Sequence, residues 1–294
     1  MNTLQSILFA VLLPASLFAS EHMPDGVKVT RDRVPETQGV QSWSITSPYQ
    51  EGTNKVEVLL PSDFDPSQHY PVVYCLPVNA GTKGDWGHPL KEAKRNHLAD
   101  MYQAIFVCPS FALLPWYGNN PENPRIREND HILKAVIPFV ESHYPVKKNH
   151  NYLIGFSKSA IGALSVFFRQ EHPFAKVAVF ENWYGNPSKK QWEKWGFKTC
   201  YGTRANLTLY NPQDVVAKYA KQFSGGPVRV TVLGGGPGRR IGVEKLMKQL
   251  RKAGIPHFEI WERGMGHRWT SGWLPLAVSS LFTNTESPSI VSGH

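Results

Sequence analysis

The chain has 294 residues, of which 41% are hydrophobic and 12% aromatic, and its formal net charge is +9. This length and composition predict one large domain with a substantial core and exclude a bundle of membrane-spanning helices. The basic residues are spread along the sequence and are not interleaved with aromatic residues, so we expect no nucleic-acid partner.

The N-terminus carries an apolar run without charged residues, from Leu4 to Phe18, which ends on two small residues. The run is too short for a stable membrane-spanning helix and is typical of the apolar region and cleavage end of a signal peptide. We therefore expect residues 1–20 to be a signal peptide and residues 21–294 to form a single domain. The mature protein is then secreted or periplasmic, with no stable membrane insertion. The alternative is a buried or anchoring N-terminal helix.

The remaining sequence predicts an α/β fold. Residues 39–60 alternate between apolar and polar, as antiparallel strands do. From residue 71 onward, short apolar runs alternate with helix-like segments, which predicts a mostly parallel sheet with helices on both faces. The segment 182–223 breaks this alternation, and we expect it to be an insertion or lid over the carboxyl edge of the sheet, where α/β proteins bind ligands. The predicted buried strands are Val72–Leu76, Ala104–Cys108, Asn151–Gly155, Lys176–Phe180, Val228–Leu233 and Phe258–Trp261. The predicted helices are Pro89–Tyr102, Asp130–His143, Ser159–Glu171, Val243–Ala253 and Leu274–Phe282.

The strongest motif is a Gly-x-Ser-x-Ser sequence at residues 155–159, between an apolar strand and an apolar helix. A nucleophile elbow needs this order, because its serine lies on a tight and strained strand-to-helix turn. Small residues on either side of the serine let the strand and the helix approach each other. Gly155 provides the first, and Ser159 stands where a second glycine is usual. The motif predicts that Ser157 is a nucleophile. The alternative is a merely structural strand–turn–helix.

A histidine and an acid are needed to activate such a serine. His267 lies in a glycine-rich loop between the last predicted strand and the last predicted helix, so it is the candidate general base. The loop after the strand predicted at 228–233 is the usual place for the acid, but residues 234–238 contain no carboxylate. Glu181, at the end of the preceding strand, keeps the chain order of serine, acid and histidine. We favour Glu181, with Glu244 and Asp214 as alternatives.

Backbone N–H groups should stabilise the oxyanion of the reaction. The N–H of Lys158 follows the nucleophile at the start of a helix. The second donor should come from the loop after the strand predicted at 72–76. Pro77 has no N–H, so the donor is Val78 or Asn79. No spacing of metal ligands occurs in the sequence, and we expect neither a metal nor a cofactor.

The chain as a whole resembles the esterase branch of the α/β hydrolases, which includes feruloyl esterases, esterase D-like enzymes and antigen 85-type acyltransferases. The resemblance spans residues 40–282 and is greatest to exported bacterial members with the same Gly-Phe-Ser-Lys-Ser elbow. It implies the α/β-hydrolase fold, and it supports Glu181 as the acid, because such relatives can carry an acidic residue at this position. The segments that carry it are Leu76–Val78 with Gly81 and Gly84, Pro115–Asn119, His131–Val146, the elbow, and the loop ending in His267.

These residues together predict a serine carboxylic-ester hydrolase that works through an acyl-enzyme, on a small-molecule or polysaccharide ester. Aromatic residues near the predicted carboxyl edge suit a sugar or aromatic ester. The rivals are a serine peptidase, a transacylase, and a catalytically impaired exported binding protein of the same fold. The predicted substrate-binding residues are Trp116, Tyr117, Trp183 and Trp269.

Overall fold

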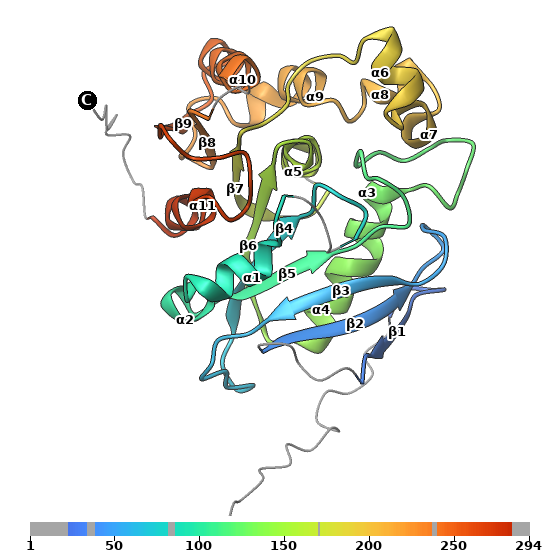
Figure 1. Cartoon of the computed structure of the whole chain (residues 1–294), viewed down its shortest axis with the longest axis vertical. Helices are drawn as coiled ribbons and strands as arrows, with labels where there is room; N and C mark the ends of the chain where they lie inside the picture. Colours follow the sequence, from blue (N-terminus) through green and yellow to red (C-terminus); the bar gives the residue numbers. More distant parts are fainter. Residues whose placement is uncertain (1–22, 34–38, 82–85, 170, 237–239, 284–294) are drawn as a thin grey trace, which may run out of the picture.

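The computed structural model describes residues 23–33, 39–81, 86–169, 171–236 and 240–283. The predicted signal peptide and Gly84 lie outside these residues. Strands form one sheet in the order β1-β2-β3-β5-β4-β6-β7-β8-β9, drawn in Figure 1. Pairing is antiparallel from β1 through β3 to β5 and parallel across the rest of the sheet. The strands are β1 (Lys28–Arg31), β2 (Val40–Thr46), β3 (Asn54–Leu59), β4 (Tyr70–Leu76), β5 (Ile105–Pro109), β6 (Val146–Phe156), β7 (Phe174–Phe180), β8 (Val230–Gly234) and β9 (His257–Trp261).

Helices cover both faces of the sheet (Figure 1). The face that carries α1, α2 and α11 buries side chains such as Val73 and Cys75 of β4, and the opposite face buries Val72 and Tyr74 of the same strand. Burial on both faces explains why this strand reads as a continuous apolar run. The helices are α1 (Pro89–Arg95), α2 (Leu98–Tyr102), α3 (Glu128–His131), α4 (Ile137–His143), α5 (Ser159–Arg169), α6 (Lys189–Lys194), α7 (Phe197–Tyr201), α8 (Arg204–Leu207), α9 (Pro212–Tyr219), α10 (Arg240–Lys252) and α11 (Trp273–Phe282), with a π-helical segment η1 (Ile132–Val136) and a 3-10 segment η2 (Ala220–Gln222).

The structure confirms the predicted buried strands to within a few residues and corrects two helices. The helix predicted over Pro89–Tyr102 is two helices, because His97 adopts a left-handed backbone conformation with φ 52°. Residues on either side of this break still bury apolar side chains against the sheet, so the apolar pattern continues through it. The helix predicted over Asp130–His143 begins at Glu128 and passes through the π-helical segment η1. Among the described residues, no helix is long and apolar enough to cross a bilayer.

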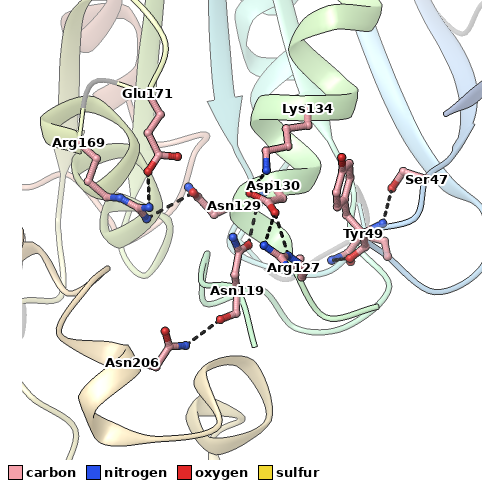
Figure 2. Close-up of polar contacts among 11 residues, drawn as sticks. Ser47, Tyr49, Asn119, Arg127, Asn129, Asp130, Lys134, Arg169, Glu171 and Asn206 are labelled. Carbon is pink, nitrogen blue, oxygen red and sulfur yellow. Dashed lines mark hydrogen bonds and ion pairs between the residues drawn. The ribbon is translucent and has the colours of Figure 1, made fainter. Parts of the chain in front are cut away.

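The segment 182–223 folds into α6 to α9 and η2 and lies beside α5, at one end of the molecule in Figure 1. A cluster of mostly aromatic residues packs the segment against Ile161, near the start of α5, the helix that follows the predicted nucleophile. Polar contacts hold the segment as well. Figure 2 shows Asn206 donating to the backbone oxygen of Asn119 (2.7 Å), whose side chain accepts from the N–H of Asp130 (3.1 Å). The cluster comprises Trp116, Ile161, Trp192, Phe197, Cys200, Tyr201, Leu207 and Tyr210.

Candidate active site

The turn between β6 and α5 has the backbone of a nucleophile elbow. Ser157 follows the last residue of β6, and its φ of 54° is left-handed, a strained conformation for a residue with a side chain. Gly155 is required by close packing, because a Cβ there would lie 2.6 Å from Cα of Ala160. The small residue that the motif demands therefore lets the strand and the helix meet behind Ser157.

Ser159, which departs from the usual glycine of the motif, has a structural function of its own. Its side chain is fully buried. The hydroxyl accepts a hydrogen bond from the N–H of Phe156 and donates one to the oxygen of the same residue, each at 2.9 Å. The hydroxyl thus ties the first residue of α5 to the last residue of β6 across the turn.

His267 reaches the nucleophile from the loop before α11. Its Nε2 lies 2.9 Å from the Oγ of Ser157, within hydrogen-bond distance. The imidazole contacts two aromatic rings, Phe156 at a centroid distance of 4.6 Å and Trp86 at 5.3 Å. The loop itself is held by the N–H of Trp269, which donates to the oxygen of Trp86 at 2.8 Å. The imidazole is therefore positioned to accept the proton of Ser157.

Glu181 completes the cluster from the end of β7. Its side chain is fully buried. Its φ of 50° is left-handed, so the backbone turns sharply where the strand ends. Its Oε2 lies 3.5 Å from Nδ1 of His267, within ion-pair range but longer than a normal hydrogen bond. Among the residues that the structure describes, neither of these two atoms has a hydrogen-bonding partner. Such contacts are often long in unliganded sites and shorten when substrate binds.

The other two acids considered from the sequence are engaged elsewhere. Glu244 is exposed on α10 and pairs with Arg240 at 2.6 Å. Asp214 lies on α9 and accepts a hydrogen bond from Asn211 at 3.1 Å. Of the three candidates, the structure brings Glu181 to the histidine.

The glycine run after β8 provides hydrogen-bond donors to the Glu181 carboxylate. Oε1 of Glu181 accepts hydrogen bonds from the N–H groups of Gly235 (3.2 Å) and Gly236 (3.0 Å). A Cβ on Gly236 would overlap Oε2 of Glu181. No residue pattern signals this contact, because nearly every residue type carries a backbone N–H.

The residues predicted as oxyanion donors end up beside the elbow. Strands β4 and β6 pair in parallel with Leu76 opposite Gly155. The loop after β4, which carries Val78 and Asn79, therefore begins on the strand next to the one that leads into the elbow. Lys158 supplies the N–H directly after the nucleophile, ahead of α5. Asn79 follows Val78 and is partly exposed.

Three of the four aromatic residues that were predicted to contact substrate are buried in the structure. Trp269, Trp116 and Tyr117 are at most 5% exposed, so their side chains belong to the protein interior. Trp116 stacks on Phe197 with ring centroids 3.7 Å apart. Trp183 is only partly buried and remains a candidate for contact with substrate. Trp86, which the sequence analysis left out, is likewise partly buried and touches His267.

Two buried ionisable groups, Lys158 and Glu128, were also missed. Nζ of Lys158 is buried 4.9 Å from the ring centroid of Trp116 and has no hydrogen-bonding partner within the described part of the chain. Desolvation lowers the pKa of Lys158 to about 7, against an opposing effect of Glu128. Desolvation raises the pKa of Glu128 to about 7, although hydrogen bonds from Cys200, Tyr117 and Trp116 oppose the shift. No sequence motif links two residues so far apart in the chain.

Neither the known family models nor the curated protein sequences match the chain, but solved structures do. An S-formylglutathione hydrolase from Agrobacterium tumefaciens is similar with a TM-score of 0.67 at 13% identity, over 87% of this chain and 98% of that one. FphF, a fluorophosphonate-binding serine hydrolase of Staphylococcus aureus, is similar with a TM-score of 0.65 at 14% identity, over 82% and 96%. A ferulic acid esterase from the anaerobic fungus Anaeromyces mucronatus has a TM-score of 0.55 at 17% identity, over 90% and 92%.

These similarities extend over nearly the whole of each chain and agree with the sheet order and the helices on both faces described above. The sequence resemblance had implied the same architecture. The chain has the α/β-hydrolase fold.

Proposed function

We propose that the protein is a serine carboxylic-ester hydrolase that works through an acyl-enzyme. The observation that carries the proposal is the arrangement of Ser157, His267 and Glu181, in which the histidine lies 2.9 Å from the serine oxygen and 3.5 Å from a buried carboxylate. Proteins of similar structure are named as an S-formylglutathione hydrolase, which acts on a thioester, and as a ferulic acid esterase.

The proposed reaction starts with the attack of Oγ of Ser157 on the ester carbonyl, while Nε2 of His267 takes the hydroxyl proton. The N–H groups of Lys158 and of Val78 or Asn79 stabilise the oxyanion. When the intermediate collapses, the C–O bond to the alcohol breaks and the leaving oxygen takes the proton from His267. Water, deprotonated by the same imidazole, then releases the acid and regenerates Ser157. Glu181 stabilises the imidazolium in both steps.

We propose an aromatic ester or an ester-substituted polysaccharide as substrate. Two partly buried indoles support this choice, since Trp86 touches the catalytic imidazole and Trp183 contacts the ring of Trp116 beside the elbow helix. The net charge of +9 suits a polysaccharide that carries acidic groups. Export to the periplasm or the outside of the cell, where such polymers occur, remains a proposal based on the N-terminal sequence.

The decisive experiment is the intact mass after treatment with a fluorophosphonate, for the wild type and for Ser157→Ala, followed by turnover of a panel of esters. A single adduct on the wild type, absent from the variant, is the expected result. Turnover of feruloyl or acetylated-sugar esters would then identify the acyl group. A wild type that forms no adduct would overturn the proposal, and the exported binding protein would replace it.

A further inference from the structure

Tyr117, which the sequence analysis assigned to substrate, makes a different and unexpected contact. Its phenol is fully buried and donates a hydrogen bond to the backbone oxygen of Pro77, the first residue after β4. Its ring lies directly against the second turn of α5, where a Cβ on Gly162 would overlap it. One side chain therefore connects the elbow helix with the loop that provides an oxyanion donor.

The oxygen of Pro77 and the N–H of Val78 belong to the same peptide group. That group is planar and trans, so its C=O and its N–H point in opposite directions. A hydrogen bond that holds the oxygen on one side of the plane fixes the direction of the N–H on the other side. The register of β4 and β6, with Leu76 opposite Gly155, brings the end of β4, from which this peptide group follows, next to the end of the strand that leads into Ser157.

The backbone of Tyr117 is itself held in place. Its φ is 66°, a left-handed conformation that needs support from its surroundings. The N–H of Tyr117 donates to the carboxylate of Glu128, and so does the N–H of Trp116, at 2.7 Å. The thiol of Cys200 lies 3.3 Å from the same carboxylate oxygen. Glu128 is 1% exposed, so this anchor lies within the protein.

The phenol is also a permanent donor. Desolvation, with the neighbouring Glu128 carboxylate, raises the pKa of Tyr117 well above its usual value, so the hydroxyl keeps its proton at neutral and moderately alkaline pH. The contact with Pro77 therefore persists over the pH range in which a histidine base is active.

We infer that Tyr117 is a positioning residue, which orients the Pro77–Val78 peptide group so that the N–H of Val78 serves as the second oxyanion donor. The inference rests on the proposed function, because an oxyanion forms only if Ser157 attacks a carbonyl. It also names Val78, rather than Asn79, as the donor.

The test compares Tyr117→Phe with Tyr144→Phe, in the full-length protein, using p-nitrophenyl acetate as substrate and trifluoroacetophenone as an analogue that forms a tetrahedral adduct with serine. Tyr144 is the control, because its phenol is also buried and also donates to an oxygen of the protein, Oε1 of Gln41 in β2 at 2.7 Å, in the antiparallel part of the sheet. Thermal unfolding of both variants shows whether the loss of each buried hydroxyl lowers the unfolding temperature by a similar amount.

We expect Tyr117→Phe to lower kcat by about 10- to 100-fold with KM little changed, because a misdirected N–H weakens binding of the transition state and not of the ester. Affinity for trifluoroacetophenone should fall by the same factor as kcat/KM. Tyr144→Phe should keep kcat within about threefold of wild type. A Tyr117→Phe enzyme with wild-type kcat, or an equal loss in both variants, would overturn the inference.

The outcome is separable from that of the proposed function. A wild type that reacts with a fluorophosphonate and turns over p-nitrophenyl acetate supports the hydrolase, whatever Tyr117→Phe does. A rise in KM with unchanged kcat would return Tyr117 to the substrate-binding role expected from the sequence and would overturn its positioning role.

Discussion

Gly236 donates its backbone N–H to the carboxylate of Glu181 across 3.0 Å, and Gly235 donates to the same oxygen across 3.2 Å. Glu181 comes from the end of β7, whereas the glycines follow β8, the place where the catalytic acid was first expected from the sequence. The ends of two neighbouring strands therefore contribute different groups to the same site. One supplies the acid, and the other supplies N–H groups that bind one oxygen of its carboxylate and leave the second oxygen for His267.

The first prediction concerns the acid. Glu181→Gln should lower kcat for ester hydrolysis by about 100- to 10,000-fold, because a neutral amide does not stabilise the imidazolium that forms on His267. Steady-state kinetics on p-nitrophenyl acetate measures this loss. Glu244→Gln is the matched control, since that carboxylate is exposed and paired with Arg240, and it should leave kcat unchanged. Equal activity of the two variants would remove Glu181 from the proposed triad.

The second prediction concerns the glycine loop. Gly236→Ala should lower kcat by about 10-fold or more, because its Cβ would displace the carboxylate that supports His267. Gly226→Ala is the control. A Cβ at Gly226 would meet only one atom within 4 Å, the oxygen of Phe223 at 3.6 Å, an ordinary van der Waals distance. Wild-type kcat in Gly236→Ala would show that the carboxylate does not depend on this loop.

Much of this arrangement is readable in the sequence, because local chemistry dictates it. The elbow needs small residues beside Ser157, and strands buried on both faces need continuous apolar runs, so motif and strands were both predictable. The contact of Glu181 with residues 235–236 was not predictable, since backbone N–H groups leave no mark on residue type. His97 shows the same limit, because its left-handed φ breaks a helix without interrupting the apolar pattern.

Burial of the aromatic residues was the least predictable feature. Trp116 and Tyr117 stand in one short segment near the carboxyl edge, a position that suits either substrate contact or packing. Trp116 packs in the interior because aromatic residues of the segment 182–223 cover it. Which distant side chains meet depends on how that segment folds back, and no local pattern encodes this.

The third prediction tests the serine that replaces glycine in the elbow. Ser159→Ala should lower the free energy of unfolding by about 1–3 kcal/mol, because the N–H of Phe156 loses its buried acceptor. Ser165→Ala is the matched control on the same helix. Its hydroxyl is buried and has no hydrogen-bonding partner among the described residues, so its removal should leave stability unchanged or raise it. Urea denaturation of both variants measures the difference, and equal values would contradict the bridging function of Ser159.

The fourth prediction concerns pH. Burial lowers the pKa of Lys158 from 10.5 to about 7. Between these two values the unfolded chain binds more protons at this residue than the folded protein does, so this residue's contribution to stability rises with pH across that window. Below about pH 7 the lysine is protonated in both states, and the unfavourable burial of its charge is then fully present. Replacing the lysine by an apolar side chain of similar length should therefore stabilise the protein most at neutral and lower pH.

Lys158→Met should raise the free energy of unfolding at pH 7 by on the order of 2 kcal/mol, after the loss of the contact with Trp116 is subtracted. The gain should shrink as the pH approaches 10.5, the usual pKa of lysine. Urea denaturation at several pH values measures this trend, with Lys245→Met as the control, because that lysine is exposed on α10. A gain that stays constant across the window would mean that Lys158 keeps its charge in the folded protein, held by Glu128. The two buried groups would then be ionic throughout, and the nucleophile would lie beside a fixed positive charge.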